Sequence, residues 1–245
     1  MPAQKTKNWL MSDQPFDDSR LSVVVPCHKE SATIKKTLED LRGYFPKSEI
    51  IVCINGYDLG TINATVSCGH ANSIIYIDRA DKGCAVRLGM LATTRDIAIT
   101  VDADLPMTRE DIVLVFMATN ENDVAIGVRT NRDTELKRRV ASSIFSFVAR
   151  TLYGFSTSDT QCGLKGFSYD AATKLFSSPF CVGGLMYDIE VLLRCRLLGI
   201  SLSEIPVSWT DKRRHLSMRM AVRDIVRIVL FRFSAQYRYN YIPRI

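Results

Sequence analysis

Short apolar runs alternate with segments of helical spacing throughout the first half of the chain. The runs are rich in Val and Ile and cover residues 21–25, 49–54, 73–77, 97–102 and 123–128. The segments between them show helical spacing of apolar residues and cover residues 31–44, 59–68, 83–93 and 109–119. Strands that alternate with helices build mostly parallel sheets that are covered on both faces. The sequence therefore predicts an α/β fold with a largely parallel central sheet, in which Ser31 caps the first helix.

The second half of the chain contains the same two kinds of segment in a less regular order. We expect helices over residues 135–152, 170–176, 187–198 and 218–233, and strands over residues 164–168 and 202–207. A chain of 245 residues, of which 47% are hydrophobic, can bury one substantial core. We therefore predict one main domain over residues 21–210, a flexible arm over residues 1–20, and a basic helical extension of the same domain over residues 211–245.

Positive charge is concentrated near the end of the chain. The net charge is +6, and residues 205–245 contain nine Lys and Arg against two Asp, which leaves −1 for all preceding residues. In the last predicted helix, Arg219, Arg223 and Arg227 lie four residues apart and form one basic stripe on an otherwise apolar rod. Such a stripe suits an anionic partner, either phosphates, an acidic membrane surface or nucleic acid. No aromatic-interleaved platform or helix-turn-helix pattern accompanies it, so we do not expect nucleic acid to be the partner.

Several classes of protein are disfavoured by the composition. No segment has the ~20 apolar residues that a membrane-spanning helix needs, and residues 1–20 lack the apolar core of a secretory signal. The seven cysteines are scattered and include no Cys-x-x-Cys pair, which favours reduced, cytosolic thiols over a disulfide framework or a metal cluster. The histidines, at positions 28, 70 and 215, form no pattern typical of a hydrolase.

Two carboxylates follow the fourth apolar run, one residue apart. If the strand continues to Asp102, the side chains of Asp102 and Asp104 point to the same side of it. Carboxylates this close repel each other unless a cation lies beside them, and such oxygen ligands suit Mg²⁺ or Mn²⁺ held together with substrate phosphates. Open α/β sheets bind their ligands at the carboxyl ends of strands. The pair therefore predicts a metal and phosphate site; the alternative is a solvated turn at a strand end.

Eight short motifs, in their expected order, resemble those of the family 2 glycosyltransferases, specifically the dolichyl- and polyprenyl-phosphate mannose and glucose synthases. They lie at residues 25–30, 50–56, 81–89, 102–105, 126–129, 159–165, 187–192 and 204–209. The most specific of them is Asp-Thr-Gln-Cys-Gly-Leu-Lys at residues 159–165. The resemblance extends over residues 21–233 and implies a GT-A fold, an α/β/α sandwich with one nucleotide-sugar site.

The resemblance implies a donor site to which several segments contribute. The base and ribose of the nucleotide would be contacted by residues at the ends of the first two strands, namely Pro26, His28, Glu30, Cys53 and Asn55. The metal and the diphosphate would be held by the acidic segment and by basic side chains, namely Asp102, Ala103, Asp104, Arg129 and Arg213, with Lys82 and Arg214 as further candidates. Cations fit this chemistry, because displacement of a nucleoside diphosphate builds negative charge on the leaving oxygens.

The catalytic residues that the resemblance implies are Asp159, Gln161 and Asp104. A phosphate monoester acceptor is already anionic near neutral pH, with a second pKa of ~6, so it needs little deprotonation. We therefore expect Asp159 to orient the sugar or the acceptor more than to act as a base; a structural role for this loop residue is the alternative. Asp188 is a further candidate for the site, whereas Glu190 is expected to pair with Arg194, four residues on.

Three positions depart from the family pattern. Ile54 and Asn55 stand where the second strand of the family ends in paired acids, so the identity of the base is open. Pro106 replaces the Gln of the metal site, and a water or phosphate oxygen must take its place. Met218 stands where the family has the Lys of a Gly-Ser-Lys motif.

The function that the resemblance implies is that of an inverting hexosyltransferase. It would move mannose or glucose from GDP-mannose or UDP-glucose to dolichyl or polyprenyl phosphate, with Mg²⁺ or Mn²⁺ as cofactor. We expect it to act peripherally at the cytoplasmic face of a membrane, with a small membrane protein as a candidate partner. The helices over residues 135–152 and 218–233 would then lie at the membrane interface, unless they are ordinary core helices. The alternatives are a transferase that acts on a soluble glycan or a protein, and a non-catalytic homologue that binds a nucleotide sugar.

Overall fold

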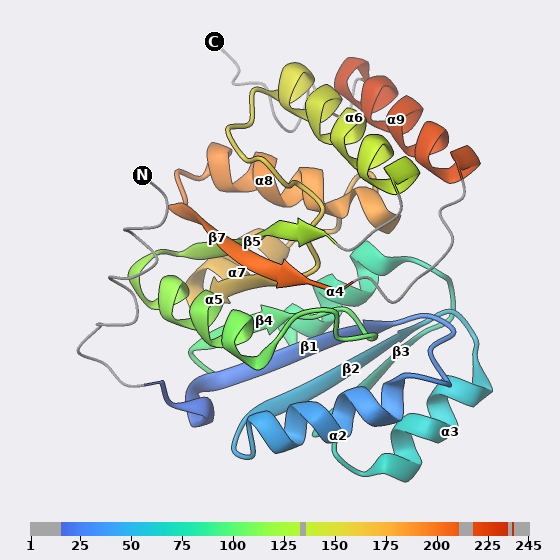
Figure 1. Cartoon of the computed structure of the whole chain (residues 1–245), viewed down its shortest axis with the longest axis vertical. Coiled ribbons are helices and arrows are strands. Elements are labelled where there is room, and N and C mark those ends of the chain that lie inside the picture. Colours follow the sequence, from blue (N-terminus) through green and yellow to red (C-terminus); the bar gives the residue numbers. More distant parts are fainter. Residues whose placement is uncertain (1–15, 133–135, 211–217, 235–236, 238–245) are drawn as a thin grey trace.

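A seven-stranded sheet forms the centre of the molecule (Figure 1). The computed structural model describes residues 16–132, 136–210, 218–234 and 237. The strand order is β3-β2-β1-β4-β6-β5-β7, and the strands are β1 (Leu21–Cys27), β2 (Glu49–Asn55), β3 (Ser73–Ile77), β4 (Ile97–Thr100), β5 (Val124–Arg132), β6 (Lys165–Ser168) and β7 (Leu202–Trp209). Neighbouring strands are parallel, except that β6 is antiparallel to both β4 and β5. The predicted α/β class with a mostly parallel sheet is confirmed.

Helices cover both faces of this sheet. One face packs against α2 (Ile34–Tyr44), α3 (Leu59–Cys68) and α5 (Arg109–Glu121), and the other against α4 (Lys82–Leu91), α7 (Tyr169–Phe176) and α8 (Tyr187–Leu197). Within β1, Val23 and Val25 belong to the core on the α2 side, whereas Val24 belongs to the core on the α4 side. Burial on both faces explains why β1, β2 and β4 are nearly continuous apolar runs.

Two further helices, α6 (Leu136–Tyr153) and α9 (Met218–Phe233), lie side by side as an outer layer over α8 (Figure 1). Ile189 of α8 points away from the sheet into a separate apolar core that it shares with both helices. The hydroxyl of Tyr153 in α6 donates to the carbonyl of Ile228 in α9 at 2.6 Å. The helical extension is therefore packed onto the main domain through α8.

Several predicted boundaries differ from the structure, and two of them differ because the chain forms a turn. The first helix begins at Ile34 with Thr33 as its N-cap residue, so Ser31 is not the cap. The physical reason is a preceding turn, in which the amides of Thr33 and Ile34 both donate to the carbonyl of Glu30. The fourth strand ends at Thr100, two residues before the predicted end, because the chain then turns.

The first described residues, which the prediction places in the flexible arm, are docked on the domain. The ring of Phe16 lies 5.6 Å from that of Phe45 and 4.9 Å from that of Phe116, measured between centroids. Residues 18–20 form a short 3₁₀ helix, η1, and Arg20 pairs with Asp96 at 2.7 Å. The arm is therefore shorter at its C-terminal end than predicted, and its remainder lies outside the described residues.

Among the helices of the described residues, none combines the length and the apolar character that crossing a membrane requires. All seven cysteines are described, and none forms a disulfide bond. The predicted free thiols are thus confirmed.

Candidate active site

The acidic segment after β4 lies at the carboxyl ends of the parallel strands. It is a turn and not a continuation of the strand, because the amide of Leu105 donates to the carbonyl of Asp102 at 2.9 Å. Leu105 has a φ of 43°, a conformation that costs a non-glycine residue ~1–3 kcal/mol. The expectation that strand alternation aligns Asp102 with Asp104 is therefore wrong. Within the turn Asp104 is buried, whereas the side chain of Asp102 is 20% exposed.

Distant elements hold this turn in place. The hydroxyl of Thr37 in α2 donates to the carbonyl of Ala103 at 2.7 Å. The amide of Thr210, which follows β7, donates to the carbonyl of Pro106 at 2.8 Å. Ala103 itself is buried. Ala103 and Pro106 thus fix the acidic turn through their backbone, and these contacts stabilise the unfavourable conformation at Leu105.

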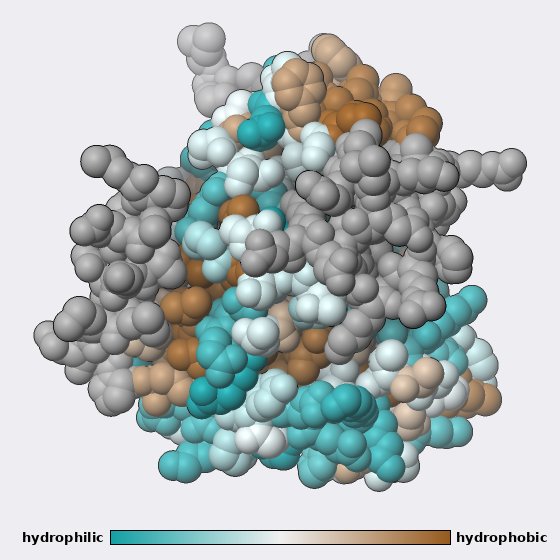
Figure 2. Space-filling model, in the orientation of Figure 1, coloured by the Kyte–Doolittle hydropathy of each residue, from teal (hydrophilic) through white to brown (hydrophobic). Residues whose placement is uncertain are grey.

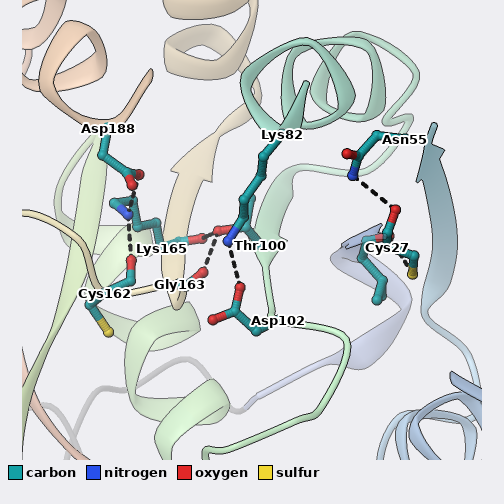
Figure 3. Close-up of polar contacts among 10 residues, drawn as sticks. Cys27, Asn55, Lys82, Thr100, Asp102, Cys162, Gly163, Lys165 and Asp188 are labelled. Atoms are coloured by element: carbon teal, nitrogen blue, oxygen red, sulfur yellow. Dashed lines mark hydrogen bonds and ion pairs between the residues drawn. The ribbon is translucent and has the colours of Figure 1, made fainter. Parts of the chain in front are cut away.

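Lys82 binds Asp102 across the site (Figure 3). Its ammonium nitrogen lies 2.7 Å from Oδ1 of Asp102, and its side chain is 25% exposed. Lys82 is the first residue of α4, and the side chain of Asp81 caps this helix by accepting from the amide of Cys84 at 3.1 Å. A helix N-terminus carries a partial positive charge. The start of α4 therefore presents positive potential next to the acidic turn, as a diphosphate-binding site requires.

The donor set of the acidic turn fits a hard divalent cation. Carboxylate oxygens are the ligands that Mg²⁺ and Mn²⁺ prefer, usually one or two together with phosphate oxygens and water. Within the part of the chain that the structure describes, no group of three or more His, Cys, Asp or Glu side chains could hold a metal. Asp102 and Asp104 would therefore hold such an ion only together with oxygens of the substrate or of water. The Lys82 ammonium on Asp102 shows that this carboxylate accepts a cation.

The predicted nucleotide end of the site joins the ends of β1 and β2. The side-chain amide of Asn55 donates to the carbonyl of Cys27 at 2.8 Å (Figure 3), and a ring nitrogen of His28 lies 2.6 Å from the carbonyl oxygen of Asn55. Asn55 is buried and His28 is exposed. This bond engages one of the two amide hydrogens of Asn55, so its side-chain oxygen and its second amide hydrogen are the groups through which it would recognise a base.

Three other residues are predicted to contact the base and ribose, and only one of them, Glu30, has a partly exposed side chain. Pro26 and Cys53 are buried within their strands, and burial raises the pKa of the Cys53 thiol to about 12. These two residues can act on a nucleotide only through the backbone. Glu30 is partly exposed beside them, and its side chain accepts from the hydroxyl of Thr33 at 2.7 Å. The ligand roles of these residues remain predictions.

Arg129 and Asp159, for which the resemblance implies separate roles, form one ion pair. Nε and Nη2 of Arg129 lie 2.6 and 2.7 Å from the two carboxylate oxygens of Asp159. The guanidinium also stacks over Trp209, 5.3 Å from the ring centroid. Burial disfavours its charge, but the hydrogen bonds and charge of Asp159 outweigh burial and raise the pKa of Arg129 above its ordinary value. Any action of Arg129 on a phosphate therefore involves Asp159 as well.

Gln161 is an accessible side chain of the Asp159 loop and the largest among its exposed or partly exposed residues, the others being Ser156 and Ser158. It is partly exposed, whereas its neighbours Thr160 and Cys162 are buried. Its amide is therefore the group of this loop that is best placed to reach a sugar or an acceptor. The predicted catalytic roles of Gln161 and Asp159 remain predictions.

Lys165, the last residue of the most specific motif, has no role among the predictions from the sequence. Lys165 is 1% exposed, and its ammonium pairs with Asp188 of α8 at 2.7 Å. A signal was available, because a lysine within an otherwise apolar, buried strand is rarely placed there without a partner. Asp188, a predicted site candidate, is thus connected to the site by its ion pair with Lys165.

The remaining predicted residues divide into two groups. Glu190 pairs with Arg194 at 3.7 Å, as predicted, and its other oxygen accepts from the amide of Val182. Arg213 and Arg214 lie outside the described residues, and the side chains of Met218 and Arg219 are not described either.

The mostly parallel sheet with helices on both faces is the GT-A fold of glycosyltransferases. A solved structure of glucosyl-3-phosphoglycerate synthase from Mycobacterium tuberculosis, in complex with Mn²⁺, UDP and phosphoglyceric acid, aligns with a TM-score of 0.67. The alignment covers 91% of this chain and 85% of that chain, at 16% identity, so it bears on the fold alone.

The family model of glycosyl transferase family 2 matches residues 22–182, more than half of the chain, and the chain belongs to this family. Its curated relatives include dolichyl-phosphate beta-glucosyltransferases of Dictyostelium discoideum, 26% identical over 87% of this chain and 75% of the relative, and of Homo sapiens, 26% identical over 85% and 73%. Glycosyltransferase AglD of Haloferax volcanii is 27% identical over 78% of this chain and 33% of its own length. The predicted family is therefore confirmed.

Proposed function

We propose that this chain transfers a hexose from a nucleotide-diphosphate sugar to dolichyl or polyprenyl phosphate, with glucose as the preferred sugar. Glucose is favoured over mannose because the relatives in Dictyostelium discoideum and Homo sapiens are both dolichyl-phosphate beta-glucosyltransferases. UDP-glucose is accordingly the first candidate donor and GDP-mannose the second. The observation that carries the proposal is the acidic turn at the strand ends, with Lys82 and the start of α4 beside it.

This arrangement suits a single displacement at the anomeric carbon. An oxygen of the acceptor phosphate would attack that carbon while its bond to the donor diphosphate breaks, and the electron pair would leave with the nucleoside diphosphate. A Mg²⁺ or Mn²⁺ ion bound by Asp102 and Asp104 would neutralise charge on the leaving diphosphate. Lys82 and the N-terminus of α4 would bind the same phosphates and stabilise the charge that develops there.

A single displacement inverts the anomeric configuration, and the Asp159 loop supports this course. A retaining reaction through a covalent intermediate would need a carboxylate nucleophile at the anomeric carbon. Both oxygens of Asp159 are bound by Arg129, which makes this carboxylate a poor nucleophile. We infer that Asp159 instead positions Arg129, and that Gln161 contacts the sugar or the acceptor.

A lipid acceptor also fits the outer surface of α6 and α9. Six large apolar side chains of these helices are between 48 and 68% exposed and form what we call the outer apolar face: Ile144, Phe147, Val222, Val226, Leu230 and Phe233. Figure 2 shows this apolar surface over the two helices. Arg223 and Arg227 are exposed on α9 among them. We propose that this face rests on a cytoplasmic membrane surface, with the apolar side chains in the lipid and the arginines at the headgroups.

The test is a panel of donors and acceptors offered to the wild-type protein. UDP-glucose and GDP-mannose are each supplied with Mn²⁺ or with a chelator. The acceptors are a polyprenyl phosphate in anionic vesicles, or soluble phosphoglyceric acid and a soluble glycan. We expect labelled sugar in the lipid fraction, most from UDP-glucose, and only with the metal. Transfer to the soluble acceptors alone would contradict the lipid acceptor, and donor binding without any transfer would identify a non-catalytic binding protein.

A further inference from the structure

Lys165 carries a positive charge that is buried in the central sheet. Only 1% of the residue is exposed, and it lies on β6 between β4 and β5. Its ammonium donates to Oδ1 of Asp188 at 2.7 Å and to the carbonyl of Cys162 (Figure 3). Burying an ion pair is expensive, and an apolar pair of similar volume is often as stable or more so. The charge of Lys165 therefore calls for an explanation other than stability.

The backbone that Lys165 holds is also held from β4. The hydroxyl of Thr100 donates to the carbonyl of Gly163 at 2.8 Å (Figure 3). Lys165 fixes the Cys162 carbonyl and Thr100 fixes the next one along the chain. The peptide segment of Cys162 and Gly163 is thus attached at two consecutive carbonyl groups, one by the ammonium of Lys165 at the start of β6 and the other by the hydroxyl of Thr100 at the end of β4.

This segment lies directly against the carboxylate of Asp102. A Cβ atom added to Gly163 would lie 2.8 Å from Oδ1 of Asp102 and closer still to Oδ2, nearer than real Cβ atoms approach other atoms. Only a glycine permits this approach. On another side, the ammonium of Lys82 lies 2.7 Å from Oδ1. The orientation of the Asp102 carboxylate is therefore set between the Gly163 backbone and Lys82.

We propose that Lys165 is a positioning residue for Asp102, which it orients through the backbone of Cys162 and Gly163. Asp188 balances the charge of Lys165, so the start of α8 is connected to the acidic turn. An apolar side chain in place of Lys165 would fill the same space but would leave the Cys162 carbonyl without its ammonium donor. This inference rests on the proposed function, in which Asp102 binds a divalent cation and the donor diphosphate.

The test uses the full chain with the double substitution Lys165→Met and Asp188→Asn. Both charges are removed together, so no unpaired charge stays buried, and Asn retains an acceptor for the hydrogen bond that joins Asp188 and Tyr187. Titration calorimetry measures the binding of UDP and of GDP with and without Mn²⁺, well below the unfolding temperature. We expect Mn²⁺-supported binding to weaken at least tenfold, with metal-free binding nearly unchanged. Metal-supported binding within twofold of the wild type would overturn the proposal.

A control separates positioning from a general loss of stability. Ile51→Val shortens a buried side chain on β2, a strand that pairs with β1 and β3 and not with β6, so it lies outside the proposed network. We expect it to lower the unfolding temperature slightly and to leave Mn²⁺-supported binding unchanged. If it weakened that binding as much as the double substitution does, the effect would be one of stability, and the proposal would be overturned.

A second variant keeps the proposal testable if the double substitution prevents folding. Thr100→Val is nearly isosteric and removes only the hydroxyl that holds the Gly163 carbonyl. We expect a loss in the same direction, about threefold, and no loss would contradict the proposal. Measurements on the wild type distinguish a failure of the proposed function from a failure of this inference. If it shows no Mn²⁺-dependent nucleotide binding, the metal site fails and this inference with it, whereas normal wild-type binding with unaffected variants overturns this inference alone.

Discussion

Asp159 binds Arg129 through both of its carboxylate oxygens, at 2.6 and 2.7 Å, and the two side chains are 1 and 12% exposed. The amide of Arg129 lies 3.3 Å from the same carboxylate. This geometry ties the most specific motif of the chain to the end of β5. The two residues also act as a unit, because a movement of either one would leave the other as a buried charge without its partner.

Asp159→Asn should therefore affect folding as well as transfer. The substitution leaves Arg129 buried without its counter-charge, and breaking such a pair costs ~3–5 kcal/mol. We expect the free energy of unfolding in urea to fall by about 3 kcal/mol. Turnover should fall by ~10²-fold or more while donor affinity stays nearly constant, because we expect the Arg129 that Asp159 positions to act on the acceptor phosphate or in the transition state.

The matched control for this variant is Asp170→Asn, which removes an exposed carboxylate at the start of α7. It should lower the free energy of unfolding by less than ~1 kcal/mol, through the lost charge at the helix N-terminus, and leave turnover unchanged. Donor affinity that fell in proportion to turnover in Asp159→Asn would place Asp159 in the donor site. Unchanged stability would show that the ion pair does not hold the loop.

The acidic turn should support nucleotide binding through a divalent cation. Asp104→Asn, and to a smaller extent Asp102→Asn, removes a charged oxygen ligand that a hard cation prefers. Each tenfold loss of affinity corresponds to ~1.4 kcal/mol, and we expect at least one such loss in Mn²⁺-supported UDP binding. Calorimetry with Mn²⁺ and with a chelator provides the measurement. If Asp104→Asn binds the donor and Mn²⁺ as tightly as the wild type, the metal assignment is wrong.

Lys82→Met should change metal and nucleotide binding in opposite directions. The ammonium of Lys82 lies on Asp102 in this structure, so it competes with a metal ion for that carboxylate. Its removal should tighten the binding of Mn²⁺ alone by about fivefold, since an ion pair with partly exposed partners contributes on the order of 1 kcal/mol. The same change should weaken nucleotide diphosphate binding, because a phosphate ligand is lost.

Electron paramagnetic resonance of free Mn²⁺ and calorimetry with nucleotide measure the two effects of Lys82→Met separately. Arg87→Met, on the same helix but hydrogen-bonded to the carbonyl of Ser177, is a suitable control for the loss of one positive charge. Weaker binding of Mn²⁺ alone in Lys82→Met would show that the lysine supports the metal site and does not compete with it.

The outer apolar face should bind anionic membranes. Leu230→Asp places a charge in the middle of this face and should abolish flotation with anionic liposomes. Val66→Asp is the matched control, since Val66 is 61% exposed on α3 and lies outside the outer apolar face. Arg223→Gln and Arg227→Gln should each remove ~1 kcal/mol of binding at low salt and less at high salt. Binding of wild type and Leu230→Asp to the same degree would exclude this face as the membrane contact.

The strands were predictable because their burial leaves a direct trace in the sequence. Residues 21–25 are all buried and lie in β1 as predicted, and α9 spans the predicted residues 218–233. The antiparallel insertion of β6 between β4 and β5 was not predictable, since an apolar run carries no information about its direction or its neighbours in a sheet. The Glu190–Arg194 pair was predictable because the two residues lie four apart on one helix.

The site was predictable in its residues more than in its geometry. Asp102 and Asp104 stood out as a pair, yet a turn and not strand alternation arranges them, because β4 ends at Thr100. The contact of Lys165 with Asp188 joins residues 23 positions apart and depends on the packing of α8 onto the sheet. Likewise, the pairing of Arg129 with Asp159 follows from the fold and not from either motif alone.

The most direct test of the account is the anomeric configuration of the product and its dependence on metal. The wild-type protein is incubated with UDP-α-glucose, Mn²⁺ and a polyprenyl phosphate, and the product is examined by nuclear magnetic resonance. We expect a β-linked glucosyl phosphate lipid that is absent when the metal is chelated and at least tenfold less abundant with Asp104→Asn. An α-linked product, or equal amounts of product without metal, would contradict a metal-supported single displacement at this site.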